Sequence, residues 1–119
     1  DRIQHAIDPC DPALFLLSGG TTGIPKMIPR SHNDYVCNSK LASKFTGIDD
    51  SSVLLDVLPI AHNLPLACPG LQGFMLKGAK VVLHTSTRAE QVFDLIQKHN
   101  ITHIHVVPAL LIMWMNMVC

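Results

Sequence analysis

The chain has 119 residues, of which 48% are hydrophobic and 15% are charged, and its formal net charge is zero. This length and apolar content allow one compact domain with its own core. The lack of a basic excess argues against a nucleic-acid-binding protein, although a local loop of backbone N–H groups can still bind a small anion.

The start of the chain, DRIQHAIDPCDP, is polar and interrupted by proline, unlike a signal peptide, and no apolar run reaches the roughly 20 residues that span a bilayer. The four cysteines are scattered without a C-x-x-C pair, which favours reduced thiols and a cytoplasmic location. The chain lacks a starting methionine and stops within an apolar helical pattern, LLIMWMNMVC. We therefore expect an internal piece of a longer enzyme.

The first predicted elements flank a glycine-rich loop. Residues 14–17 (LFLL) predict a short buried strand, and residues 26–32 (KMIPRSH) predict a second extended segment. Because Pro25 and Pro29 disfavour a helix after the loop, the expected arrangement is strand–loop–strand.

The rest of the chain alternates between helical and strand patterns. Helices are predicted at 33–45, 71–78, 87–100 and 109–117, strands at 52–60, 79–85 and 102–108, and an irregular connection at 61–70. Thr87 and Glu90 have the T-x-x-E spacing of a capping box. The alternation indicates an α/β fold of βαβ units, with a mainly parallel sheet covered by helices on both faces.

The loop SGGTTGIPK, at 18–26, combines glycines, hydroxyl side chains and a lysine, which suits a polyphosphate leaving group. It is not a P-loop, because Lys26 is separated from the preceding glycine and is followed by Met27 instead of Ser or Thr. Nor does it match the dinucleotide fingerprint, because its first two glycines are adjacent. The structural alternative is a tight turn in a β-hairpin.

Together with the flanking IPRSHNDY and the downstream LPIAHNLPLACPG, this loop resembles the adenylate-forming superfamily. The combined motifs are most similar to the stand-alone aryl acid adenylating enzymes of siderophore biosynthesis, over essentially the whole chain. The resemblance implies part of the N-terminal AMP-binding domain, without the C-terminal domain. It also implies that an aryl carboxylate attacks the α-phosphate of Mg²⁺-bound ATP, and that the aryl group then passes to the phosphopantetheine thiol of a carrier protein.

The resemblance assigns roles residue by residue. The loop residues implied to hold the outer phosphates are Ser18, Gly19, Gly20, Thr21, Thr22, Gly23 and Lys26. Lys26 and His62 are the candidate catalytic residues, and His62 would line the junction between substrate and AMP, although an isolated histidine there could equally be structural. No metal ligand is assigned in this chain. The family's Mg²⁺-binding glutamate, ribose-binding aspartate and C-terminal catalytic lysine are expected beyond Cys119.

His62, Asn63 and Cys68 are the expected substrate-binding residues. Amino-acid-activating relatives have aspartate where this chain has Asn63, and the neutral amide suits a phenolic hydroxyl instead of an ammonium group. Relatives that take salicylate tend to have cysteine at the position of Cys68, and those that take 2,3-dihydroxybenzoate have serine. A serine hydroxyl without a ring 3-OH to meet would stay unpaired, so salicylate is favoured. A buried cysteine with no bearing on specificity is the alternative.

Two other interpretations stay open. The chain could come from another acyl- or aryl-CoA ligase, or from a non-catalytic adenylation-like module used for protein contact.

His99, His103 and His105 are interpreted as polar residues at a helix end and along a strand, not as a metal site. We expect no membrane partner, and no adenylation by residues 1–119 alone.

Overall fold

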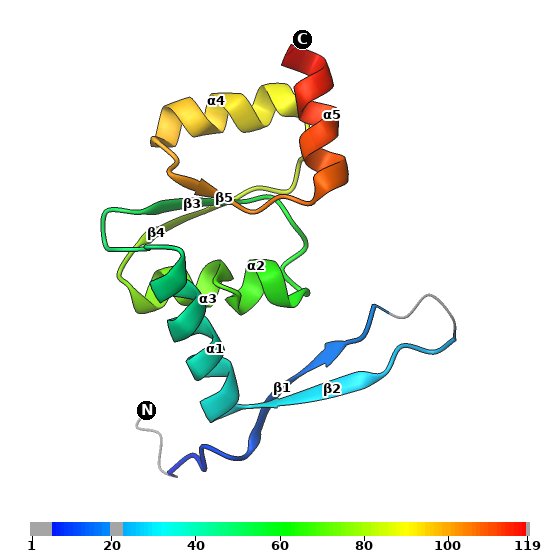
Figure 1. Cartoon of the computed structure of the whole chain (residues 1–119), viewed down its shortest axis with the longest axis vertical. Coiled ribbons are helices and arrows are strands. Elements are labelled where there is room, and N and C mark those ends of the chain that lie inside the picture. Colours follow the sequence, from blue (N-terminus) through cyan, green and yellow to red (C-terminus); the bar gives the residue numbers. More distant parts are fainter. Residues whose placement is uncertain (1–5, 20–22, 119) are drawn as a thin grey trace.

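The computed structural model describes residues 6–19 and 23–118, in which strands and helices alternate (Figure 1). The strands are β1 (Pro12–Leu17), β2 (Met27–Ser31), β3 (Val53–Asp56), β4 (Lys80–Leu83) and β5 (His103–Ile104). The helices are α1 (His32–Phe45), α2 (Asn63–Ala67), α3 (Gly70–Leu76), α4 (Ala89–His99) and α5 (Pro108–Val118). Within the described residues, no helix is both long enough and apolar enough to cross a bilayer.

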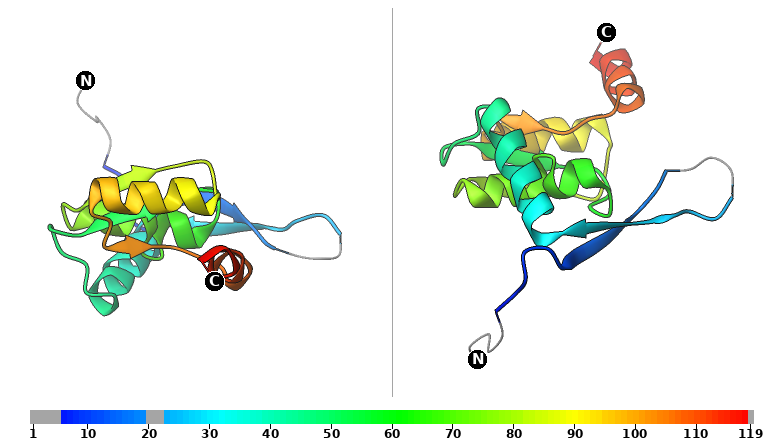
Figure 2. Two further views of the ribbon diagram at one scale, coloured as in Figure 1. Left: turned by 90° about the horizontal axis from the view of Figure 1, so that it is seen from above. Right: turned by 60° about the horizontal axis from the view of Figure 1, so that its bottom comes forward.

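The strands form two separate sheets. β1 and β2 pair antiparallel as a hairpin, and β4, β3 and β5 form a parallel sheet in that order. In Figures 1 and 2 the hairpin projects away from the parallel sheet and its helices. The predicted α/β fold with a parallel sheet and the predicted strand–loop–strand arrangement are confirmed.

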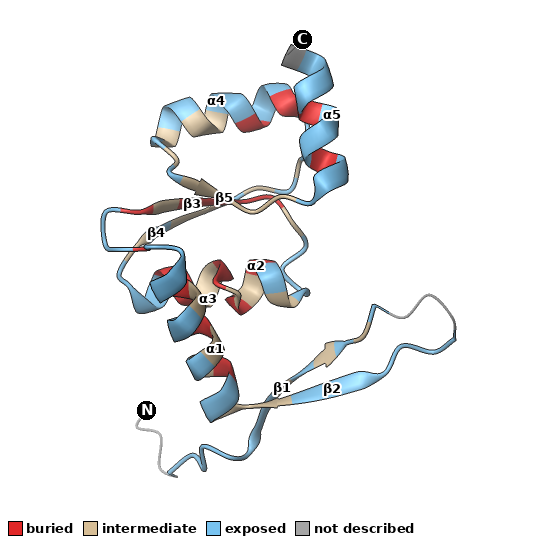
Figure 3. Ribbon diagram, viewed as in Figure 1, coloured by how far each residue is buried: buried red, intermediate tan, exposed pale blue. Residues whose placement is uncertain are grey.

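Helices cover both faces of the parallel sheet. Successive residues of its central strand point to opposite sides and so pack in two different apolar clusters. Leu55 packs in one apolar cluster with Val92 of α4 and Trp114 of α5. Leu54 packs in the other cluster with Ile48 and Phe74. Figure 3 shows the buried positions of α4 and α5 on one side of the sheet and those of α1 and α3 on the other.

Small buried serines hold α1 against the short helices α2 and α3. Ser39 Oγ donates to the carbonyl oxygen of Ala67 at 2.9 Å, and Ser43 Oγ lies 3.1 Å from the carbonyl oxygen of Gly73. Both serines are fully buried. These long-range bonds satisfy polar groups that would be costly to bury unpaired, and they fix the position of α2.

Three sequence-based expectations are wrong. β1 was expected to be buried, but Phe15 is 57% exposed and Leu17 is 65% exposed, because the hairpin pairs only with itself among the described elements. The connection at 61–70 is not wholly irregular, because it contains α2 and the start of α3. Pro65 is compatible with α2 because it lies in the first turn, where its missing N–H would have no helical partner.

The third error concerns the start of α4. Its N-cap is Arg88, which makes no side-chain capping bond, so Thr87 and Glu90 do not form the predicted capping box. Instead, the carbonyl oxygen of Thr87 accepts a hydrogen bond from Trp114 Nε1 at 2.7 Å, which ties α5 to the start of α4. The predicted strands at 52–60, 79–85 and 102–108 all exist but are shorter than expected.

Candidate active site

Ser18 and Lys26 close the base of the glycine-rich loop, at the end of the hairpin where the loop joins the two strands. The backbone N–H of Ser18 donates to the carbonyl oxygen of Lys26 at 2.9 Å, and the backbone N–H of Lys26 donates to Ser18 Oγ at 3.0 Å. Gly23 has a φ of +100°, a conformation that favours glycine. The loop is therefore a hairpin connection, but longer than the tight turn considered as an alternative.

Gly19 and Lys26, near the two ends of the loop, are exposed to solvent. Gly19 has open space around its Cα. Gly20, Thr21 and Thr22 lie outside the described residues. The exposed glycine backbone and lysine at one end of the ribbon suit a large anion that approaches from solvent.

His62 and Asn63 lie where the chain enters α2, shortly after the carboxyl end of β3. His62 is the N-cap residue of α2 and is exposed; its backbone N–H donates to the carbonyl oxygen of Pro59 at 3.1 Å. Asn63 is half-buried, and its Oδ1 atom is buried without a hydrogen-bond partner. The carboxyl edge of a parallel sheet is where α/β folds bind ligands, and this amide oxygen has hydrogen-bonding capacity that no described residue uses.

Cys68 follows the last turn of α2 as its C-cap, one helix length from Asn63. It lines a cavity of about 460 Å³ together with Leu64, Phe74, His103 and His105, among others. The rings of both histidines lie edge-on to Phe74, with centroids 5.3 and 6.3 Å away. Burial lowers the pKa of His105, and the neighbouring His103 lowers it further, so the neutral form of the His105 side chain is favoured.

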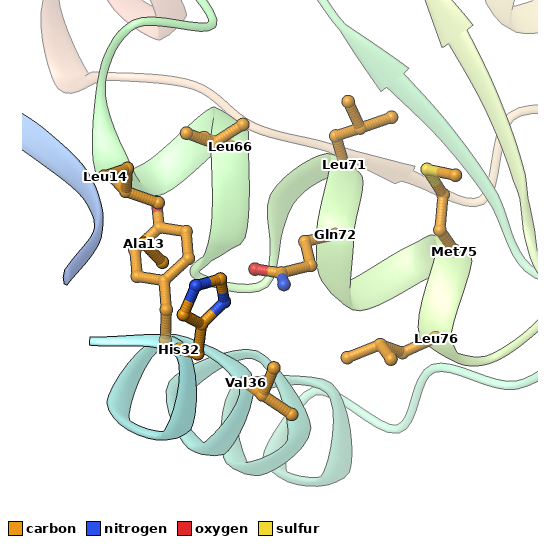
Figure 4. Close-up of a pocket in the computed structure, with 10 residues that line it drawn as sticks. Ala13, Leu14, His32, Val36, Leu66, Leu71, Gln72, Met75 and Leu76 are labelled. Carbon is orange, nitrogen blue, oxygen red and sulfur yellow. The ribbon is translucent and has the colours of Figure 1, made fainter. Parts of the chain in front are cut away.

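A second, apolar groove separates the hairpin from α2 and α3. It has a volume of about 460 Å³ and is lined from β1 by Leu14, from α1 by His32, and from the short helices by Leu66 and Gln72. Figure 4 shows the side chains of His32 and Gln72 pointing into it. Among the described residues, no hydrogen bond or ion pair joins the loop to the stretch from His62 to Cys68. The structure thus places Asn63 in α2 with His62 and Cys68 at the two ends of that helix, and Ser18 with Lys26 at the end of the hairpin.

Sequence reasoning missed one polar residue at the carboxyl edge of the sheet. Asp56, the last residue of β3, is buried, and its Oδ2 atom has no hydrogen-bond partner. Burial raises the pKa of Asp56, and a hydrogen bond from the Leu58 N–H opposes that rise. The signal in the sequence was a single acid inside the apolar run VLLDVLPI.

Comparison with known proteins places this arrangement in a family. The family described as "AMP-binding enzyme" matches residues 1–118. A salicyl-AMP ligase / salicyl-S-ArCP synthetase of Mycobacterium tuberculosis is 47% identical over 107 residues, which are 90% of this chain and 19% of the relative. A salicylyl-CoA synthase / salicylate adenylyltransferase of a Streptomyces species is 44% identical over 118 residues, 99% of this chain and 21% of the relative.

A solved structure of a related protein has the same fold. The apo structure of MbtA from Mycobacterium smegmatis superposes with a TM-score of 0.91 at 48% identity, over 93% of this chain and 21% of that one. The chain thus spans about a fifth of the length of the proteins it matches. It belongs to the family of AMP-binding enzymes, and its sequence relatives include aryl acid adenylating enzymes.

Proposed function

We propose that the chain is part of the N-terminal AMP-binding domain of an aryl acid–AMP ligase. The complete enzyme activates an aryl acid with ATP, releases pyrophosphate, and passes the aryl group to a carrier-protein phosphopantetheine thiol in siderophore biosynthesis. The observation that carries this proposal is the buried, unpaired Oδ1 atom of Asn63 at the start of α2. A neutral amide in this place can accept a hydrogen bond from a phenol, and its NH₂ group can donate one.

The glycine-rich loop is proposed to bind the phosphates of ATP. Bound Mg²⁺–ATP would supply an electrophilic α-phosphate and a pyrophosphate leaving group. The residues proposed to grip the outer phosphates are Ser18, Gly19, Gly20, Thr21, Thr22, Gly23 and Lys26. The paired ends of the loop hold Lys26 at its base, where its charge would stabilise negative charge on the departing group. His62, exposed next to Asn63, is proposed to line the junction between the aryl acid and AMP.

Salicylate is the proposed substrate, in preference to 2,3-dihydroxybenzoate. The thiol of Cys68 is a weak hydrogen-bonding group, so it would leave no strong partner unpaired opposite a ring that lacks a 3-OH. The half-buried position of Cys68 in a cavity wall is compatible with this role. The names of the Mycobacterium and Streptomyces relatives, which both include salicylate activation, support the same substrate.

A CoA ligase is the second candidate. The Streptomyces relative is named both a salicylyl-CoA synthase and a salicylate adenylyltransferase. The two candidates share the adenylation half-reaction and differ only in the thiol that accepts the aryl group.

Pyrophosphate exchange by the complete enzyme tests the proposal. We expect ATP–pyrophosphate exchange that depends on salicylate, is weaker with 2,3-dihydroxybenzoate, and is absent with amino acids. Offering the charged enzyme a phosphopantetheinylated carrier protein or CoA then separates the two candidates. Exchange with an amino acid but with no aryl acid would contradict the assignment of Asn63.

A further inference from the structure

A cavity at the carboxyl ends of β3 and β4 contains polar groups that the proposed function does not use. It has a volume of about 490 Å³ and is lined by residues 56–60 and 83–85; we call it the Asp56 cavity. A backbone hydrogen bond joins the two strands at this cavity: the N–H of His84 donates to the carbonyl oxygen of Asp56 at 3.0 Å. This backbone bond holds the ends of the two strands together, while the paired residues are Asp56 and Leu83, so the side chains of Asp56 and His84 start on opposite faces of the sheet.

Each of these two residues has a buried side-chain atom without a partner. Asp56 is 2% exposed; its Oδ1 atom accepts the N–H of Leu58 at 3.3 Å, and its Oδ2 atom accepts nothing. The Nε2 atom of His84 is also buried and unpaired. A buried carboxyl oxygen without a donor is costly, and a carboxylate without a counter-charge is costlier still.

The described part of the chain provides no such counter-charge. Its ion pairs join Arg30 to Asp34 and Arg88 to Glu90, and neither includes Asp56. No group of three His, Cys, Asp or Glu side chains among the described residues could hold a metal ion. The remaining walls of the Asp56 cavity are largely apolar side chains, such as Val57, Pro59 and Leu83.

We propose that the Asp56 cavity binds a primary ammonium group attached to a short apolar chain or ring. The ammonium donates a hydrogen bond to Asp56 Oδ2, the buried oxygen that has no partner among the described residues. The apolar part of the ligand lies against the walls. A charged donor fits better than a neutral one, because it compensates the buried carboxylate as well as its unfilled lone pair.

Binding of 2-phenylethylammonium to the complete enzyme tests this site, with neutral 2-phenylethanol as the matched control. Calorimetry is performed with saturating salicylate present, so that the proposed substrate site is occupied and its failure is distinguishable from that of the Asp56 cavity. We expect the ammonium to bind at least about tenfold more tightly than the alcohol. Asp56→Asn should abolish the difference, and Asp50→Asn, which changes an exposed aspartate, should preserve it.

A crystal structure of the wild-type enzyme soaked with the ammonium provides a test that does not depend on any variant. We expect its nitrogen within hydrogen-bond distance of Asp56 Oδ2. Equal affinity for the ammonium and the alcohol would overturn the proposal. So would a lysine or arginine of the complete enzyme already bonded to Oδ2.

Discussion

Ser18 and Lys26 are joined by two hydrogen bonds, one from the Ser18 N–H to the Lys26 carbonyl oxygen and one from the Lys26 N–H to Ser18 Oγ. The first bond continues the antiparallel ladder beyond the Leu17–Met27 pair. The second uses a side chain, so it depends on the identity of residue 18. The geometry of the proposed phosphate loop therefore depends on a serine hydroxyl at its base.

Replacing Ser18 with alanine should loosen this base and weaken ATP binding. A hydrogen bond of this kind contributes about 0.5–1.5 kcal/mol, so we expect the KM for ATP to rise about three- to tenfold in pyrophosphate exchange. The matched control is Ser51→Ala, in an exposed turn, which should leave the KM for ATP unchanged. An unchanged KM in Ser18→Ala would mean that the loop does not need this bond.

Asn63→Asp tests whether the neutral amide of Asn63 binds the substrate. A carboxylate at this half-buried position would repel the aryl carboxylate and would lack a counter-ion. We expect kcat/KM for salicylate to fall at least about a hundredfold, a loss of about 2.7 kcal/mol. Asn33→Asp, on the exposed face of α1, makes the same chemical change and should have little effect. Full salicylate activity in Asn63→Asp would remove Asn63 from the site.

Cys68→Ser tests the choice between the two aryl acids. The hydroxyl can pair with a ring 3-OH, so the ratio of kcat/KM for 2,3-dihydroxybenzoate to that for salicylate should rise about tenfold. Cys37→Ser changes an exposed thiol on α1 and should not alter the ratio. If both variants keep the wild-type ratio, Cys68 has no part in specificity.

Gly73 of α3 should tolerate no side chain. A Cβ atom there would lie 2.7 Å from Ser43 Oγ and 2.8 Å from Pro69 Cβ, which is closer than real Cβ contacts. Gly73→Ala should therefore lower the stability of the enzyme by about 1–3 kcal/mol, visible as a lower midpoint in denaturant unfolding. Gly19→Ala, where a Cβ would meet no atom within 4 Å, should keep the midpoint. Equal midpoints for Gly73→Ala and the wild-type enzyme would contradict the close packing of α3 against α1 at Gly73.

Asp56 should make stability depend on pH. Burial raises the pKa of its carboxyl in the folded protein above the unfolded value, so the folded state binds more protons and loses stability as pH rises through the raised pKa. Asp56→Asn lacks this loss, so its Tm should exceed the wild-type Tm by more at pH 8 than at pH 4. Thermal melts without added amine measure the difference. A difference that is constant with pH, or larger at pH 4, would contradict the unpaired burial of this carboxyl.

Local patterns in the sequence predicted much of this fold. Pro25 and Pro29 correctly indicated a strand after the loop, and the apolar runs correctly indicated a parallel sheet. The helix α2 was missed because its stability comes from outside its own sequence. The carbonyl oxygen of Ala67, in its last turn, accepts hydrogen bonds from Asn38 and Ser39, about 29 and 28 residues earlier in the chain.

The candidate site was only partly predictable, because its geometry also depends on contacts between distant parts of the chain. The motif around Asn63 marks a position by residue type, but only the fold shows that its Oδ1 atom is unpaired. Asp56 looked like an isolated acid because no local pattern shows that its carboxyl is buried. Pairing between β3 and β4 places Leu83 beside Asp56, and this long-range contact leaves no local signal.

A crystal structure of the complete enzyme with salicylate and a non-hydrolysable ATP analogue tests the central claim most directly. We predict the β- and γ-phosphates within hydrogen-bond distance of the loop at 18–26, and the salicylate hydroxyl within hydrogen-bond distance of the Asn63 amide. Nucleotide phosphates bound away from this loop, or an aryl ring that makes no contact with Asn63, would contradict the account.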